Sequence, residues 1–251
     1  MVHNSREVLD YWEREDVESM QDKYVVSGES ALIVKRLTPG SKILDAGCGE
    51  GEGTLVYASI PGTTVHGADF SNTRLKKAQA RLAGHTNIDL KRVDFISDSP
   101  LGLDTDYDFV VSQRLIINLM EWELQQQALL RLMSVLKSNG KLVLLEGSQQ
   151  GVLELNDFRA RYNLPPIPVR WHNLFLDEEK LIPFMAKNGY RLLDQDGLGT
   201  YFLMTRGIKP IFEKDPQWND EFNKVSASAE LTVSFGFGSR FSRLRLYMFG
   251  R

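Results

Sequence analysis

Apolar and polar residues alternate along the first 146 residues in blocks that predict strands and helices in turn. Short apolar runs predict strands, whereas apolar residues three or four positions apart predict amphipathic helices. The expected strands cover residues 41–45, 64–69, 88–93, 107–112 and 141–146. The expected helices cover residues 5–37, 54–59, 72–82 and 121–136. This alternation indicates an α/β fold with a parallel sheet and right-handed crossovers.

The pattern changes after Gly147. Residues 148–176 contain three prolines and predict a loop-rich segment, and residues 205–240 predict an irregular, polar and aromatic one. Between them, residues 177–188 predict a helix with Asp177 as its N-cap. A strand is expected to begin at Tyr190, and residues 241–249 alternate well enough to predict a closing strand.

Composition narrows the class of protein. The chain has 251 residues, of which 42% are hydrophobic, and 30 basic against 33 acidic residues give a net charge of -3. That charge offers no broad attraction to nucleic acid. One cysteine excludes an internal disulfide and a cysteine-rich zinc site, so we expect no metal. Without an apolar run of 18 residues or a signal peptide, we expect a cytoplasmic protein with no membrane partner; the oligomeric state is unknown.

The most informative segment follows the strand at residues 41–45. An acid ends the strand and glycines follow at alternate positions, in the sequence D-A-G-C-G-E-G-E-G over residues 45–53. Glycine lets a ligand approach the backbone closely because it has no Cβ. The turn lacks the Lys-Ser/Thr of a phosphate-binding loop and the G-x-G-x-x-G register of dinucleotide-binding folds. Glu50 and Glu52 are expected to repel a pyrophosphate, so a cationic ligand suits the turn better.

Later strands also end in polar residues. Asp69 ends the second strand about 20 residues after the turn, where doubly wound folds place an acid on ribose hydroxyls. Asp94-Phe95 ends the third strand and Ser112-Gln113-Arg114 the fourth. Because open α/β sheets bind ligands at the carboxyl ends of their strands, these residues are expected to share one site.

Together these motifs resemble the class I S-adenosylmethionine-dependent methyltransferases over about residues 41–146. The resemblance implies a Rossmann-like doubly wound sheet of seven strands, the last antiparallel, with an insertion before it. It also implies a single domain with an N-terminal helical lid (residues 1–40), a cofactor-binding core (41–146) and an acceptor-site segment with closing strands (147–251). The implied cofactor is S-adenosylmethionine, and S-adenosylhomocysteine is the product. The implied cofactor-binding residues are Asp45, Gly47, Cys48, Gly49, Gly51, Asp69, Phe70, Ser71, Asp94, Phe95, Ser112, Gln113, Arg114 and, from the lid, Tyr11, Trp12 and Tyr24.

Several of these residues also have a purely structural interpretation, in which Asp45 caps the helix after the turn. Asp69 and Asp94 suit strand-end caps, Phe70 and Phe95 suit the core, and Cys48 suits a small packing residue. The lid aromatics suit simple helix packing.

His172 is the candidate catalytic base, because it lies in the segment after the fifth strand that is expected to cover the acceptor. Its unperturbed pKa near 6.5 suits proton transfer at neutral pH. The alternative is that Trp171 and His172 only pack together. Arg159, Arg161 and Arg170 are candidates for binding an anionic group of the acceptor, with a solvated surface as the alternative.

The sequence therefore predicts methyl transfer to a small polar metabolite, with a hydroxyl or amine from a carbohydrate pathway as the candidate acceptor. One alternative is a protein or RNA methyltransferase, although neither a basic domain nor a basic stripe is present to favour RNA. The other alternative is a non-catalytic protein that binds S-adenosylmethionine.

Overall fold

The computed structural model describes residues 3–17, 20–232 and 236–251. Within them, seven strands form one sheet in the order β3-β2-β1-β4-β5-β7-β6. Neighbouring strands are parallel except around β7, which is antiparallel to both β5 and β6. The strands are β1 (Lys42–Ala46), β2 (Thr64–Asp69), β3 (Ile88–Arg92), β4 (Tyr107–Gln113), β5 (Leu136–Gly147), β6 (Arg191–Gly197) and β7 (Leu244–Gly250). The predicted doubly wound sheet with an antiparallel last strand is confirmed.

Helices connect the strands and cover the sheet. The first five are α1 (His3–Glu13), α2 (Lys23–Val34), α3 (Glu52–Ala58), α4 (Asn72–Arg81) and α5 (Trp122–Ser134), and a short 3₁₀ turn, η1 (Ile116–Asn118), follows β4. The later ones are α6 (Gln149–Ala160), α7 (Glu178–Lys187), α8 (Gly199–Phe202), the π-helical segment η2 (Leu203–Ile208), α9 (Lys209–Phe212) and α10 (Glu221–Thr232).

Two apolar cores hold the sheet between these helices. On one face, Leu129 and Leu132 of α5 and Met185 of α7 pack against β4, β5 and β7. On the other face, Ile33 of α2 and Tyr57 of α3 pack against the central strands. The buried stripe at Ala128, Leu129, Leu132 and Met133 has the spacing of an amphipathic helix, which explains why the sequence predicted α5 well.

Four predictions about elements were wrong. One helix was expected at residues 5–37, but α1 and α2 are separate, and Asp22 caps α2 by accepting the backbone N–H groups of Tyr24 and Val25. The predicted fifth strand begins earlier, at Leu136, because residues 137–140 form a bulge between the pairs Tyr107–Leu136 and Phe109–Lys141.

The other two errors fall after residue 147. The segment expected to be loop-rich contains α6, which Ser148 caps through the N–H of Gly151. The segment expected to be irregular contains α9 and α10 and most of η2. Apolar residues on these helices, such as Leu155, pack into the same core as α2. Tertiary packing therefore stabilises helices whose own periodicity is weak.

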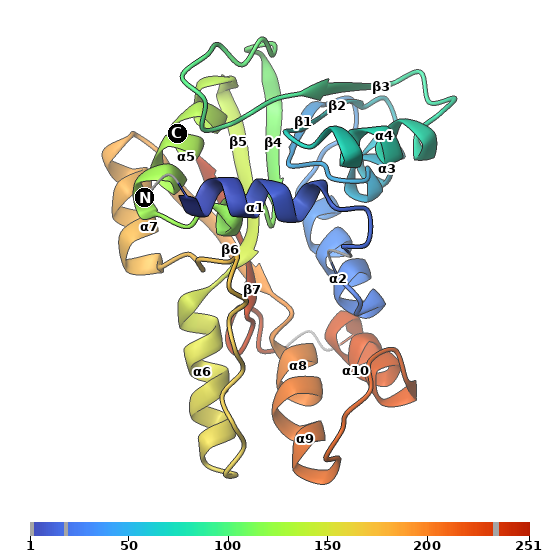
Figure 1. The fold of residues 1–251 in the computed structure, drawn as a ribbon, viewed down its shortest axis with the longest axis vertical. Helices are drawn as coiled ribbons and strands as arrows, with labels where there is room; N and C mark the ends of the chain where they lie inside the picture. The colour runs from blue at the N-terminus through green and yellow to red at the C-terminus, as the bar shows by residue number, and fades with distance from the viewer. Residues whose placement is uncertain (1–2, 18–19, 233–235) are drawn as a thin grey trace.

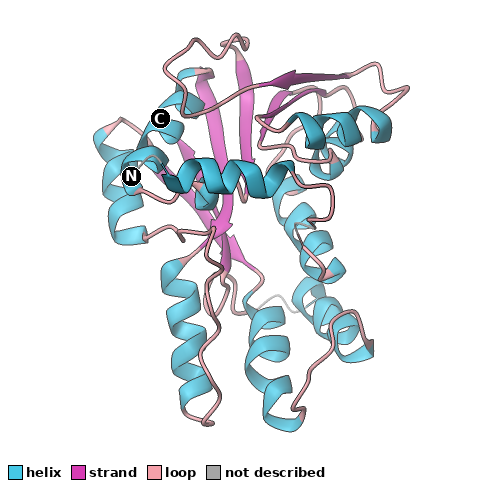
Figure 2. Cartoon of the chain, viewed as in Figure 1, coloured by secondary structure: helices cyan, strands magenta, loops and turns pink. Residues whose placement is uncertain are grey.

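The additional helices extend the molecule beyond the carboxyl ends of the parallel strands. Figure 1 shows α6 and α8–α10 beyond that edge of the sheet, with α1 crossing in front of it. In Figure 2 the strands lie in the upper half of the molecule with helices around them, and the lower half consists of helices and loops. Among the described residues, the helices are all too short or too polar to cross a membrane.

Candidate functional site

A cavity of about 840 Å³ opens at the carboxyl ends of β1, β2 and β4, and Val8, Leu9 and Trp12 of α1 form part of its wall. We name its two parts after the ligands expected from the sequence: the cofactor half, lined by residues that follow β1–β4, and the acceptor half, lined by residues from the α6–α7 loop, η2 and the segment where β7 begins. The cavity wall includes twelve of the predicted site residues: Trp12, Asp45, Gly47, Cys48, Gly49, Asp69, Phe70, Asp94, Phe95, Gln113, Arg114 and His172. Tyr11, Tyr24, Gly51, Ser71 and Ser112 are outside the cavity wall.

The glycine turn presents one position to open space. Gly47, Gly49 and Gly51 all have positive φ angles, of 75°, 53° and 81°, which favour glycine. A Cβ on Gly47 would meet Leu115 at 2.8 Å, and one on Gly51 would meet Leu82 at 2.8 Å. A Cβ on Gly49 would meet nothing within 4 Å. Gly49 is therefore the glycine of the three that a ligand can approach, and Gly51 instead allows the start of α3 to pack closely against the end of α4.

Asp69 holds this turn in place. Its Oδ2 accepts the N–H of Gly49 and its Oδ1 accepts the N–H of Ser71, both at 2.9 Å. Burial raises the pKa of Asp69, while the two backbone N–H groups act to lower it. Ser71 in turn caps α4 by accepting the N–H of Arg74, which explains why it lies outside the cavity wall. The carboxylate therefore has a structural role in addition to its predicted role at the ribose.

Asp45 is a buried acid next to the turn. It is 2% exposed, and its Oδ2 accepts the hydroxyl proton of Thr54 at 2.6 Å. Burial raises the pKa of Asp45 to about 7, against the opposing effect of that hydrogen bond. A nearby cation would favour the charged form, so the position suits a positively charged ligand group.

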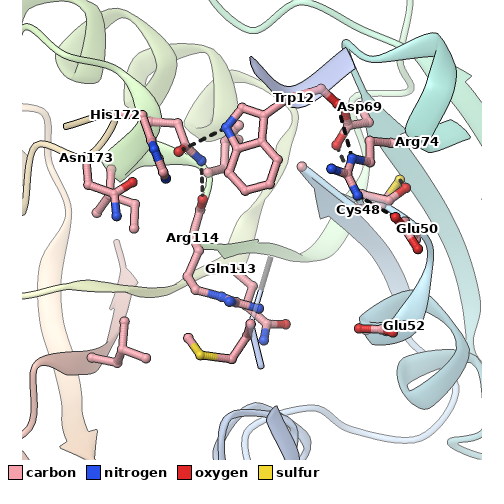
Figure 3. A pocket seen from close by; sticks show the side chains of 18 of the residues that line it. Trp12, Cys48, Glu50, Glu52, Asp69, Arg74, Gln113, Arg114, His172 and Asn173 are labelled. Carbon is pink, nitrogen blue, oxygen red and sulfur yellow. Dashed lines mark hydrogen bonds and ion pairs between the residues drawn. The ribbon is translucent and has the colours of Figure 1, made fainter. Parts of the chain in front are cut away.

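The two acids of the glycine turn, Glu50 and Glu52, form ion pairs that the sequence did not predict. Glu50 pairs with Arg74 and with Lys77, and Glu52 accepts a hydrogen bond from Arg81 at 3.0 Å. The expected repulsion of a pyrophosphate by Glu50 and Glu52 is therefore weakened by cations of α4. Figure 3 shows Arg74 between Glu50 and the segment that carries Trp12. Arg74 also donates to the carbonyl oxygens of Trp12 and Val17, so it ties the lid to the cofactor half.

At the end of β4, one residue is buried and the two that follow it are half-buried and line the cavity. Ser112 is fully buried and donates to Glu146 at 2.7 Å, which keeps it out of the cavity. Gln113 lines the cavity and donates to Glu29 at 2.8 Å. Arg114 pairs with the same carboxylate at 3.5 Å and has a φ of 58°. Non-glycine residues seldom adopt such an angle, and strained residues cluster at functional sites.

The lid covers the boundary between the two halves. Trp12 donates its indole N–H to Asn118 at 3.2 Å and lies over the cavity beside Arg114 (Figure 3). Tyr11 stacks on His172 with ring centroids 4.4 Å apart. Tyr24, at the start of α2, packs with the core that contains Val25. The N-terminal helices therefore contribute Trp12 directly and Tyr11 only through His172.

His172 combines both of its predicted alternatives. It is 3% exposed and packs against Tyr11, Trp12 and Trp171, yet it also lines the cavity. Its Nδ1 is buried and has no hydrogen-bond partner within the described part of the chain. Burial, and then the charge of Arg170, lowers the pKa of His172, so the imidazole is neutral at neutral pH. A neutral imidazole in the cavity wall can accept a proton.

The acceptor half contains arginines that sequence analysis missed. Of the three arginines proposed from the sequence, Arg170 lines the cavity. Arg159 donates hydrogen bonds to the carbonyl oxygens of Pro165 and Arg206, so its role is structural. Arg161 is exposed outside the cavity. Arg206 and Arg243 line the cavity instead. Arg206 lies in the segment expected to be irregular, where no periodic pattern marked it, whereas Arg243 lies in the predicted closing strand, whose alternation gave no sign of a ligand site. The described residues contain no group of three or more His, Cys, Asp or Glu placed to hold a metal ion.

Comparison with known proteins supports the prediction of a methyltransferase domain in the first part of the chain. Residues 43–140 match the sequence family described as a methyltransferase domain. The demethylmenaquinone methyltransferase of Bacillus mycoides is 28% identical over 141 residues, which are 54% of this chain and 56% of the relative. The demethylmenaquinone methyltransferase of Lysinibacillus sphaericus is 31% identical over 132 residues, which are 51% of this chain and 54% of the relative. The chain therefore spans little more than half the length of these relatives.

A solved structure shares the whole fold. Geranyl diphosphate C-methyltransferase from Streptomyces coelicolor superposes on this chain with a TM-score of 0.61. The match covers 99% of this chain and 98% of the methyltransferase, and the two sequences are 14% identical. At that identity the likeness concerns the fold. The fold extends over the acceptor half as well as the cofactor half.

Proposed function

We propose that this chain, which belongs to the class I S-adenosylmethionine-dependent methyltransferases, transfers a methyl group from S-adenosylmethionine to a small polar acceptor through a hydroxyl or amine. The observation that carries the proposal is that one cavity has two chemically different halves. The cofactor half has a glycine open to a ligand and buried acids at Asp45 and Asp69. The volume of the whole cavity, about 840 Å³, lies within the usual range for small-molecule sites.

Methyl transfer mainly requires that the acceptor atom be aligned with the methyl group of the cofactor. The methyl group of a sulfonium is a strong electrophile, and transfer is an in-line displacement in which the acceptor oxygen or nitrogen forms a bond to carbon as the carbon–sulfur bond breaks. Positioning of two reactants can contribute roughly 7–11 kcal/mol. A base adds to this when the acceptor is a hydroxyl, and His172 is our candidate for that role. An amine acceptor that is already neutral needs no base.

The geometry bears on the alternative acceptors. Trp12 and Asn118 line the cavity and are hydrogen-bonded to each other, and Val8 and Leu9 of α1 line it as well. A large protein or RNA acceptor would have to displace this lid, which disfavours both. The acceptor named for the two relatives does not carry over, because the chain matches only about half of each. The absence of nucleic-acid and membrane partners and a cytoplasmic location remain parts of this proposal.

Two measurements test the proposal. Calorimetry with S-adenosylhomocysteine should give a one-to-one complex, and a panel of small hydroxyl and amine metabolites should include one that is methylated. A folded protein that binds neither S-adenosylmethionine nor S-adenosylhomocysteine would contradict the proposal. Binding without transfer to any acceptor would favour the non-catalytic alternative.

A further inference from the structure

Three arginines gather in the acceptor half from segments far apart in the chain. Arg170 lies in the α6–α7 loop, Arg206 in η2, and Arg243 immediately before β7. They are close enough for the charges of Arg206 and Arg170 to disfavour the charged form of Arg243. Like charges brought together in a cavity repel, so the fold maintains this arrangement at a cost.

Few acids offset these charges. Asp22 accepts a hydrogen bond from Arg206 at 2.6 Å, but it also accepts the hydroxyl proton of Tyr201 and caps α2. Within the described residues, Arg170 and Arg243 have no carboxylate within ion-pair distance. Burial and the two neighbouring arginines lower the pKa of Arg243 to about 10, and no acid acts to raise it. Three guanidinium groups therefore share one carboxylate.

The guanidinium groups are held in place by other contacts. Arg206 stacks over Trp218 with its Cζ 3.6 Å from the ring centroid, and its Nη1 is buried without a hydrogen-bond partner among the described residues. Arg243 lies over Phe175, with its Cζ 5.5 Å from that ring centroid. Stacked guanidinium groups keep their N–H donors in a fixed plane, which is the geometry that binds an oxyanion through two parallel hydrogen bonds.

We infer that the acceptor carries a phosphate group, which Arg170, Arg206 and Arg243 bind in the acceptor half. The inference rests on the proposed methyl transfer and names the class of its substrate. Three cations against one acid leave two positive charges, which a phosphate dianion matches and a carboxylate does not. His172 and Asn173 line the same half, so the part of the acceptor that is to be methylated is expected to lie beside them.

The test measures anion binding directly and needs no known acceptor. The protein is first saturated with S-adenosylhomocysteine, so that a carboxylate of the cofactor cannot be mistaken for the anion. Inorganic phosphate and acetate are then titrated separately by calorimetry. We expect phosphate to bind and acetate to bind at least tenfold more weakly.

Variants locate the binding site. Arg243→Gln should weaken phosphate binding about 10- to 100-fold, as expected for the loss of charged hydrogen bonds. Arg170→Gln removes a charge from an exposed residue, so it keeps the test valid if Arg243→Gln fails to fold. Arg161→Gln removes an exposed arginine outside the cavity and should change nothing. Neither cavity variant should alter the affinity for S-adenosylhomocysteine.

The outcomes separate the inference from the proposed function. Phosphate binding that is equal in the wild type, Arg170→Gln and Arg243→Gln overturns the inference, as does acetate binding as tight as phosphate. The same holds if phosphate binds only to the protein without S-adenosylhomocysteine. Failure to bind S-adenosylhomocysteine at all contradicts the proposed function. Normal cofactor binding without phosphate binding contradicts the phosphate-bearing acceptor alone.

Discussion

The two halves of the cavity have opposite charge and opposite origins in the sequence. The cofactor half is lined by acids at the ends of β1, β2 and β3, and these residues all lie between Asp45 and Asp94. The acceptor half is lined by Arg170, Arg206 and Arg243, which lie in three separate segments. The first half suits a cationic ligand and the second suits an anionic one. The residues of the cofactor half can therefore be recognised from motifs close together in the sequence, whereas those of the acceptor half come together only when the chain folds.

The strongest way to separate the halves is to block the glycine turn. Gly49→Val should abolish binding of S-adenosylhomocysteine, because the added side chain enters the open space that the ligand needs. Gly49 has a φ of 53°, so the variant also carries backbone strain. Gly40→Val is the matched control, since Gly40 has a φ of 77°, open space around its Cβ position and a place at the other end of β1. Calorimetry on both variants, with circular dichroism to check folding, decides the matter. Normal binding by Gly49→Val would remove the turn from the site.

The second experiment addresses the acceptor half alone. His172→Phe keeps a ring to stack on Tyr11 but removes the nitrogen that can accept a proton. If His172 is the base for a hydroxyl acceptor, turnover should fall roughly 10²- to 10⁴-fold while the affinity for S-adenosylhomocysteine stays the same. Steady-state kinetics with the identified acceptor and calorimetry with S-adenosylhomocysteine measure the two quantities. Retained turnover per folded molecule would assign His172 to packing and would favour an amine acceptor.

Comparison of the two halves also shows which site residues could be predicted from the sequence. The glycine turn, Asp69 and Asp94 were found because strand ends and their spacing are visible along the chain. Arg243 was not, because only the antiparallel pairing of β7 with β5 brings its segment to the cavity. Arg206 was missed for a similar reason: its segment has no amphipathic period and is helical through contacts with α6 and α8.

Sequence spacing alone also could not distinguish a ligand-facing residue from its structural neighbour. Ser71 and Ser112 stand beside residues that line the cavity, yet each is turned inward by one hydrogen bond, to the N–H of Arg74 and to Glu146 respectively. Such orientations depend on side chains from other elements. The sequence therefore located the correct strand ends but overestimated how many residues at each end are available to a ligand.

A smaller effect is expected at Asp69, which both fixes the turn and is predicted to bind the ribose. Asp69→Ala should weaken binding of S-adenosylhomocysteine about 10- to 100-fold, since each charged hydrogen bond contributes about 1.5–3 kcal/mol. Phosphate binding in the acceptor half should not change. Asp98→Ala, which removes an exposed acid outside the cavity, serves as the control. An unchanged dissociation constant for Asp69→Ala would leave Asp69 with its structural role only.

The smallest expected effect is a pH dependence that only the cofactor half should show. Burial raises the pKa of Asp45 to about 7 in the ligand-free protein, so its carboxyl is largely protonated at pH 6 and largely charged at pH 8. If a cationic group of S-adenosylmethionine binds the charged form, binding below pH 7 must first release a proton. The affinity should then fall about tenfold between pH 8 and pH 6.

Asp45→Asn should remove this dependence, because the amide still accepts the hydrogen bond of Thr54 but does not titrate. 5′-Methylthioadenosine, which lacks the cationic groups, should bind the wild type equally at both pH values. Stability changes in a lower and wider window: the folded pKa of Asp45 lies above the unfolded value of about 3.9, so its contribution to stability is fully present below pH 3.9 and is lost as the pH rises from there through 7. Asp45→Asn should therefore raise the free energy of unfolding, measured in urea, more at pH 8 than at pH 5. Equal pH dependence of S-adenosylmethionine binding in the wild type and Asp45→Asn would show that the buried acid does not bind the cationic part of the cofactor.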